Sequence, residues 1–163
     1  MLTPTRELCV QVEESVKKYA MHAPISVVSV YGGVPLEPQE KKLRAGVDIV
    51  VATPGRLIDH LERQNVVFDD LEVLVLDEAD RMLDMGFAPQ INRIVADVPS
   101  YRQTLLFSAT MPPEVEALAR KYLRKPVVVQ VGRRSSAAST VTHAVYPVPR
   151  DRKSAAAGAA ASR

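Results

Sequence analysis

The sequence has few of the residues that build a disulfide framework, a metal cluster or a membrane span. Its single cysteine, Cys9, excludes a disulfide framework within the chain and is typical of a protein from a reducing compartment. The three histidines lie far apart, so no metal-ligand spacing is visible. No apolar run approaches the ~18–20 residues of a membrane span, and residues 1–6 lack the apolar core of a signal peptide. These absences predict a soluble, cytoplasmic protein with no membrane partner.

The 163 residues are nearly balanced in charge and ordinary in hydrophobicity. Hydrophobic residues make up 47% and charged residues 25%, which is close to the average soluble protein and excludes wholesale disorder. The 21 basic and 19 acidic side chains leave a net charge of +2, which is too small to indicate a polyanionic partner by itself. Length and composition together predict about one globular domain.

Short apolar, β-branched runs alternate with helical patterns along most of the chain. The expected strands are residues 25–30, 48–52, 71–76, 104–107 and 127–131. The expected helices are residues 5–21, 36–45, 54–63, 88–97 and 113–122. This alternation is typical of right-handed βαβ units and of a parallel sheet with helices on both faces. The sequence therefore predicts an α/β fold.

Both ends of the chain depart from this alternation. Residues 1–2 are the only remnant of a strand before the first helix, and residues 133–139 have the polar composition of a linker. Residues 140–148 alternate like one more strand, and an alanine-rich low-complexity tail ends the chain. Since a lone strand has no sheet to join, we expect a chain that is cut at both ends.

Carboxylates and hydroxyls follow two of the expected core strands. Asp77, Glu78 and Asp80 come after four apolar residues, at the end of a strand where open α/β sheets bind ligands. One such acid can hold Mg²⁺ through water, and its neighbour can orient or deprotonate an attacking water. Ser108 and Thr110 follow the next expected strand. A solvated acidic turn and plain helix caps are the alternatives for these two groups.

Three further segments have the composition of anion-binding turns. In residues 53–56 a threonine and a proline begin a helix, which leaves free N–H groups for an anion, and residues 3–6 repeat this arrangement. Gly32 and Gly33 allow a phosphate to approach the backbone closely, although a glycine pair is usually only a turn. Because all these segments follow strands, they predict a nucleic-acid backbone that runs past a nucleotide site.

These residues resemble the DEAD-box ATP-dependent RNA helicases, and among them the bacterial RhlE-type members. The matching segments are motif Ia at residues 3–8, the GG motif at 32–33, motif Ib at 53–56, motif II at 77–80 and motif III at 108–110. The resemblance covers about residues 1–150 and implies a RecA-like, P-loop NTPase-type parallel sheet flanked by helices. It implies part of the first RecA-like domain at residues 1–132, a linker at 133–139, the start of the second RecA-like domain at 140–150 and an unmatched tail at 151–163.

The resemblance also implies a role for each matched residue. Asp77 would hold the Mg²⁺ of Mg-ATP through water, and Glu78 would position or deprotonate the hydrolytic water. Asp80 would bond to Ser108 and Thr110 and couple the nucleotide state to strand separation. The RNA partner, a single strand or short duplex, would be contacted at its backbone without regard to base sequence. The residues implied in these contacts are Thr5, Arg6, Gly32, Gly33, Thr53, Pro54, Gly55 and Arg56.

Several parts of the family's pattern have no counterpart in the 163 residues. None of the seven glycines is followed by lysine, so the phosphate-binding Walker A loop is missing together with its strand, as are the Q motif and the second domain's motifs. We therefore expect an N-terminally truncated fold whose bare apolar edge at residues 105–107 is open to a protein partner. We also expect that this chain alone does not hydrolyse ATP. The alternatives are a non-catalytic RNA-binding or partner-docking module, and an unrelated α/β NTPase or a non-functional remnant.

Overall fold

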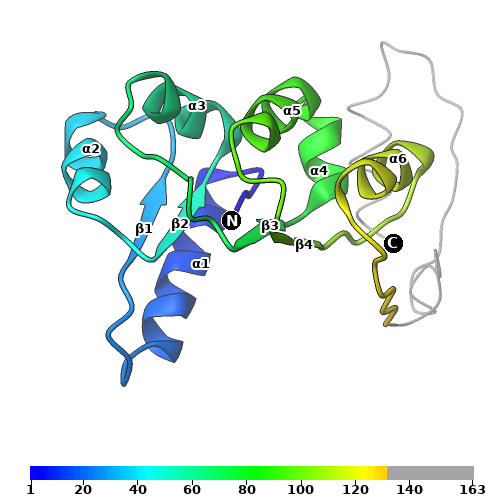
Figure 1. Ribbon diagram of the computed structural model, residues 1–163, viewed down its shortest axis with the longest axis horizontal. Helices are drawn as coiled ribbons and strands as arrows, with labels where there is room; N and C mark the ends of the chain where they lie inside the picture. Colours follow the sequence, from blue (N-terminus) through cyan, green and yellow to red (C-terminus); the bar gives the residue numbers. More distant parts are fainter. Residues whose placement is uncertain (132–163) are drawn as a thin grey trace, which may run out of the picture. The chain divides into compact units, whose positions relative to one another are not determined.

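The computed structural model describes residues 1–131 (Figure 1). The chain divides into a first unit, Met1–Val128, and a second unit, Val129–Arg163. All the helices and strands of the described residues belong to the first unit. The predicted linker, the predicted strand at residues 140–148 and the alanine-rich tail lie outside the described residues.

The strands of the first unit are short and all parallel. They are β1 (Val27–Val30), β2 (Ile49–Ala52), β3 (Val73–Leu76) and β4 (Gln103–Leu106). β1 pairs with β2, and β3 pairs with β4. Residues 1–3 lie between the two pairs, because Leu2 donates its N–H to Val75 (2.8 Å) and Thr3 donates to Ala52 (2.9 Å). The parallel sheet predicted from the sequence is confirmed, and residues 1–2 extend it by one short bridging segment.

Helices cover this sheet from both sides. They are α1 (Arg6–Tyr19), α2 (Glu37–Arg44), α3 (Pro54–Glu62), α4 (Ala79–Asp84), α5 (Ala88–Ala96) and α6 (Pro113–Tyr122). α1 packs against β1 and β2, and Figure 1 shows it on the opposite side of the strands from α2, α3 and α5. None of the helices in residues 1–131 has the length and apolar character that a membrane crossing requires.

The core lies between the sheet and these helices. In β1 and β3 alternate residues are buried, because successive side chains of a strand point to opposite faces of the sheet. Buried apolar side chains come from the strands and from the inward-facing side of each helix. The largest of them are Leu2, Val28, Val30, Val51, Leu76, Met82, Ile91, Ile94 and Val115.

The structure differs from the sequence-based expectations at two elements. The prediction of a strand at residues 127–131 is wrong, because these residues form no strand and their valines are exposed. A β-branched apolar run forms a strand only where a neighbour supplies the hydrogen-bond ladder. The short helix α4 is absent from the predicted elements, because its six residues overlap the acidic segment that is interpreted as a site.

Candidate nucleotide and nucleic-acid site

The site is built on one row of residues at which the parallel strands end. Val30 pairs with Ala52, Leu76 pairs with Leu106, and Leu2 bridges Ala52 and Leu76. These residues form a continuous line across the sheet, and we call the side of the sheet just beyond this line the carboxyl edge. Each predicted site residue follows a member of the row by one to four positions. The residues that meet at the carboxyl edge are Thr5, Arg6, Gly32, Gly33, Thr53, Pro54, Gly55, Arg56, Asp77, Glu78, Asp80, Ser108 and Thr110.

Asp77 and Glu78 occupy a sharp turn between β3 and α4. The amide of Asp77 donates to Leu2 (3.0 Å), and its Oδ1 accepts a hydrogen bond from the Glu78 amide (3.0 Å). Glu78 has a left-handed backbone (φ 49°), which is uncommon for a residue other than glycine. Its carbonyl accepts from Met82, so α4 begins directly after it. The turn fixes where both carboxylates emerge from the sheet.

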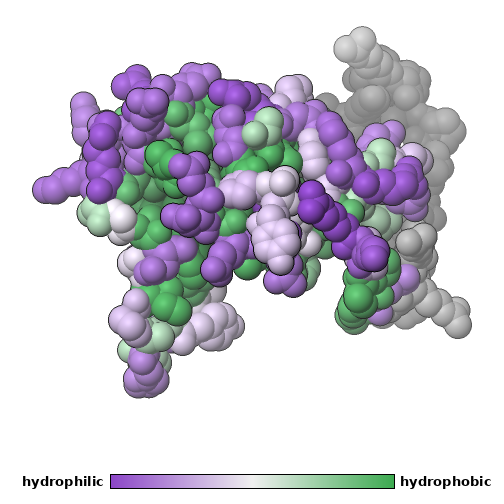
Figure 2. All heavy atoms as spheres, in the orientation of Figure 1, coloured by the Kyte–Doolittle hydropathy of each residue, from purple (hydrophilic) through white to green (hydrophobic). Residues whose placement is uncertain are grey.

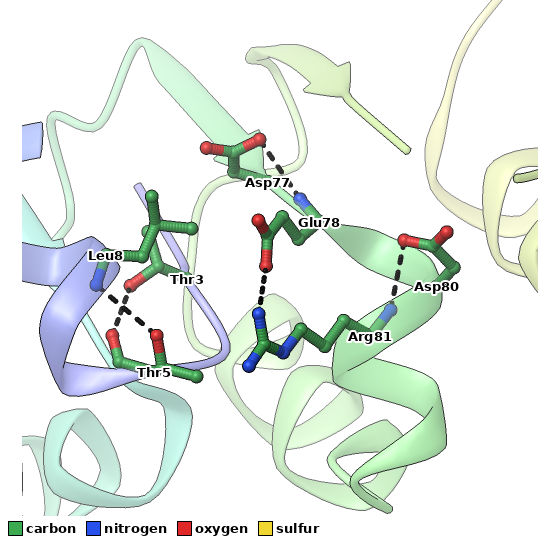
Figure 3. A network of polar contacts seen from close by, with 7 residues as sticks. All are labelled: Thr3, Thr5, Leu8, Asp77, Glu78, Asp80 and Arg81. Atoms are coloured by element: carbon green, nitrogen blue, oxygen red, sulfur yellow. Dashed lines mark hydrogen bonds and ion pairs between the residues drawn. The ribbon is translucent and has the colours of Figure 1, made fainter. Parts of the chain in front are cut away.

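The two carboxylates have different surroundings. Burial raises the pKa of the Asp77 carboxyl, and the negative charge of Glu78 adds to the rise, against the hydrogen bond from the Glu78 amide. Glu78 is directed toward Arg81, with its Oε2 3.4 Å from the Arg81 Nη1 (Figure 3). Within residues 1–131, no hydrogen bond uses the Asp77 Oδ2. Asp77 can therefore accept a cation at this oxygen without giving up a partner.

A divalent ion at this position would need ligands from outside the protein. In the described part of the chain, no three His, Cys, Asp or Glu side chains lie close enough together to hold a metal. Mg²⁺ in nucleotide sites usually has one or two carboxylates, water and the nucleotide's phosphates as ligands. Asp77 and its neighbour fit that type of site, whereas they do not fit a closed metal centre built only from protein groups.

Asp80 joins α4 to the segment after β4. The amide and the hydroxyl of Thr110 both donate to the Asp80 Oδ2, at 2.9 and 2.7 Å, and the Asp80 amide donates to the Ser108 Oγ at 3.2 Å. Burial alone would raise the pKa of Asp80, but the hydrogen bonds from Thr110 and the Arg81 amide, together with the neighbouring Ser108 hydroxyl, outweigh it and lower the pKa. The structure thus brings the third acid of residues 77–80 together with both predicted hydroxyl residues.

The start of α1 and the loop after β1 lie together at the other part of the carboxyl edge. The Thr5 Oγ1 accepts from the Leu8 amide (3.3 Å), so this hydroxyl caps α1 (Figure 3). Arg6 is exposed, and its guanidinium lies 5.0 Å from the centre of the Tyr31 ring. Gly33 has φ 80°, and a Cβ at this position would lie 3.7 Å from the Arg6 Nη1. A cation and an open glycine backbone therefore lie side by side.

Arg56 is used inside the fold rather than left free at the surface. Its Nη1 donates to the Val34 carbonyl (3.0 Å), and its Nε lies 3.3 Å from the Asp59 Oδ2. Only 13% of its side chain is exposed. The Thr53 amide donates to Val30 (2.9 Å), which holds the start of α3 against the end of β1. The residues of 53–56 shape this part of the edge, with Arg56 tying α3 to the loop after Gly33.

Sequence reasoning missed three residues that contact the predicted site residues, either directly or through one another. Arg81 pairs with Glu78, Tyr31 lies under Arg6, and Gln39 bonds to the backbone of Tyr31. The three-residue spacing on α4 could have indicated the Arg81 pair. Gln39 and Leu43 are the buried residues of α2, so a polar residue on its inner face was a visible signal.

Comparison with known proteins connects this arrangement to one family. A protein-family model described as "DEAD/DEAH box helicase" matches residues 1–118. The DEAD-box ATP-dependent RNA helicase 21 of Oryza sativa subsp. japonica is 47% identical, over 89% of this chain and 22% of that protein. The DEAD-box ATP-dependent RNA helicase 30 of Arabidopsis thaliana is 54% identical, over 81% of this chain and 22% of that protein.

A solved structure gives the same result for the fold. The crystal structure of the yeast DEAD-box splicing factor Prp28 superposes with a TM-score of 0.72 and 41% sequence identity, over 81% of this chain and 32% of that one. The chain spans about a fifth of the length of the two plant relatives.

Proposed function

Because the chain belongs to the DEAD/DEAH box helicase family, we propose that it is part of an ATP-dependent RNA helicase. In this proposal the whole helicase binds the RNA backbone and couples ATP hydrolysis to local unwinding of a duplex, whereas this chain alone does not hydrolyse ATP. Residues 1–132 form part of the first RecA-like domain, 133–139 a linker, 140–150 the start of a second such domain and 151–163 a tail. The observation that carries the proposal is the row through Val30, Ala52, Leu2, Leu76 and Leu106, which gathers acids, hydroxyls and anion-binding turns at one edge.

On the nucleotide side, the proposal assigns the acids of residues 77–80. Asp77 holds the Mg²⁺ of Mg-ATP through water, and its unpaired Oδ2 supports this assignment. The ion, when bound, neutralises charge on the nucleotide's phosphates. Glu78 orients or deprotonates the attacking water from a position set by the turn at the end of β3. Asp80, bonded to Thr110 and Ser108, links α4 to the segment after β4 and so couples the nucleotide state to that segment.

On the RNA side, the proposal assigns the segments around β1, β2 and the start of α1. No hydrogen bond or ion pair within residues 1–131 uses the guanidinium of Arg6, the amide of Gly32 or that of Gly33, so these donors are free for a phosphate. Thr53 and Gly55 lie at the N-terminus of α3, where the first backbone amides of the helix can also bind a phosphate. Thr5, Pro54 and Arg56 shape the same surface, through the α1 cap, the first position of α3 and the bond to Val34.

A second candidate function is a non-catalytic module that binds RNA or docks onto a protein. The observation that favours it is the outer edge of β4, which pairs with no strand in the described part of the chain, next to a Phe107 side chain that is 53% exposed. An unpaired apolar edge can accept a strand from a protein partner. Phosphate release from ATP by the isolated chain that RNA stimulates and Glu78→Gln abolishes would contradict this second function. We expect no release above background, because the 163 residues hold neither a Walker A loop nor the second domain's motifs.

Two finer assignments are also proposals. The match of the motif segments to the bacterial RhlE-type members is carried by the sequence alone, since the three similar proteins named in the comparison come from plants and yeast. A cytoplasmic location rests on the single, buried Cys9, which suits a reducing compartment.

The proposed function is tested by RNA binding of the 163-residue chain. We expect fluorescence anisotropy to show binding of labelled 12-nucleotide oligo-U and oligo-C with affinities within about threefold, because backbone contacts carry no base information. The affinity should fall as salt rises, by ~0.7 in log K per log unit of salt for each phosphate contact. Absence of binding, or a strong preference for one base, would overturn the assignment of the carboxyl edge to an RNA backbone.

A further inference from the structure

The loop of residues 31–34, just after β1, is held in place by side chains from two helices. Gln39 of α2 is buried and bonds to both polar backbone groups of Tyr31: its Oε1 accepts from the amide (3.2 Å) and its Nε2 donates to the carbonyl (3.0 Å). At the other end of the loop, Arg56 of α3 donates to the Val34 carbonyl (3.0 Å). The backbone on both sides of Gly32 and Gly33 is therefore fixed within the fold.

The Tyr31 ring, in turn, supports Arg6. The guanidinium lies 5.0 Å from the ring centre, within the range of a cation–π contact. The contact with the ring uses no hydrogen-bond acceptor, so the N–H groups of the guanidinium are left to donate to another group. Because no other hydrogen bond or ion pair within residues 1–131 uses this guanidinium, the Tyr31 ring is the group that orients it.

Resting on the proposed function, we propose that Tyr31 and Gln39 are positioning residues for RNA binding. Gln39 fixes the Tyr31 backbone, and the Tyr31 ring holds Arg6 beside the free amides of Gly32 and Gly33. A long arginine side chain loses rotamer freedom when it binds a phosphate, and one that is already oriented loses less. Neither residue touches the RNA in this arrangement, since each acts through Arg6 or through the loop.

The experiment is a double-mutant cycle on the 163-residue chain, read as the affinity for labelled 12-nucleotide oligo-U in low salt. Tyr31→Leu should weaken binding about two- to fivefold, the size expected of a lost cation–π contact at an exposed site, and Tyr31→Phe should keep wild-type affinity. In an Arg6→Ala background, Tyr31→Leu should have almost no further effect, because its contribution passes through Arg6. A merely structural role would give the same loss in both backgrounds.

Two more variants keep the test decisive. Tyr19→Leu removes a tyrosine that is 89% exposed at the far end of α1 and should leave binding unchanged. Gln39→Glu keeps an acceptor for the Tyr31 amide but loses the donor to its carbonyl, so it should weaken binding in the wild-type background only. If circular dichroism shows that Tyr31→Leu does not fold, Gln39→Glu takes its place in the double-mutant cycle.

The outcomes separate the two proposals. Wild-type affinity in Tyr31→Leu, or an equal loss with and without Arg6, overturns the positioning roles while RNA binding through Arg6 stands. If Arg6→Ala binds like the wild type, the positioning roles fail while RNA binding through the other segments stands. If the wild type binds no RNA, the proposed RNA-binding function fails and the positioning roles fail with it.

Discussion

Among the residues at the end of β3, the surroundings of each acid determine what it can do. Burial raises the pKa of Asp77, whereas hydrogen bonds lower that of Asp80. Within residues 1–131, the Glu78 carboxylate has only the long contact to Arg81, and both side chains of this pair are substantially exposed. Exposed pairs of this kind contribute little to stability. Asp77 is suited to a cation, Asp80 to holding two segments together, and Glu78 is free to act on a ligand.

The lowered pKa of Asp80 makes a prediction about stability and pH. A carboxyl whose pKa is lower in the folded state stabilises the fold above its unfolded pKa of ~3.9, and this contribution is lost as the pH falls through the folded value. We expect Asp80→Asn to be less stable than the wild type by roughly 1 kcal/mol at pH 6, since hydrogen bonds to a charged acceptor are weakened. Urea unfolding at pH 6 and pH 3 should show the gap narrowing in acid. A gap that does not change with pH would contradict the role of the Asp80 charge.

His60 makes a prediction about stability at a higher pH than Asp80 does. Its ring is fully buried in α3, and its Nδ1 lies 3.1 Å from the Asn65 Nδ2. Its Nε2 has no hydrogen-bond partner among residues 1–131. Burial lowers the pKa of His60, and the nearby Arg56 lowers it further. The unfolded chain therefore binds more protons in mildly acidic solution, so stability should fall as the pH drops below ~6.5 and be constant above it.

The measurement is the free energy of unfolding in urea at pH 7.5 and pH 5.5. The wild type should lose stability between these values, and His60→Leu should lose less. His22→Leu is the matched control, because His22 is exposed and its removal should leave the wild-type pH dependence. An equal loss in all three proteins would show that other groups cause it.

At the scale of elements, β4 is an edge strand and the one strand within residues 1–131 that has no buried residue. It pairs with β3 on one side only, and the exposed Phe107 follows it. We expect the chain to associate with itself through this edge at high concentration, because an unpaired apolar edge accepts another strand. Sedimentation velocity should show less association for Phe107→Lys than for the wild type. Tyr101→Lys, which changes an exposed aromatic residue before β4, should associate like the wild type.

The sequence predicted the elements that have a strong local signal. Apolar β-branched runs marked β1 to β4, and proline at the first turn marked α3, α5 and α6. The same signal failed at residues 127–131, where no neighbouring strand in the described residues completes a ladder. The bonds of Gln39 to Tyr31 and of Arg56 to Val34 could not be predicted, because they depend on how α2 and α3 pack against the end of β1.

At the scale of the whole unit, parallel pairing explains why segments far apart in sequence form one site. Leu2 bridges β2 and β3, so the start of the chain joins the two strand pairs and places α1 beside the loop after β1. Figure 2 shows polar residues spread over much of the same face as apolar ones, so hydropathy alone does not mark the site. The marker is position, since every predicted residue lies just beyond the row in which the strands end.

The most direct test of the RNA-binding carboxyl edge is a map of where RNA contacts the folded chain. Backbone amide chemical shifts should be measured on the 163-residue chain as 12-nucleotide oligo-U is added. We expect the shifts to change at Arg6, Gly33 and Thr53, and to stay constant at Val27 and Val73, the first residues of β1 and β3. Changes concentrated at the first residues of the strands, or scattered over the surface, would contradict RNA binding at the carboxyl edge.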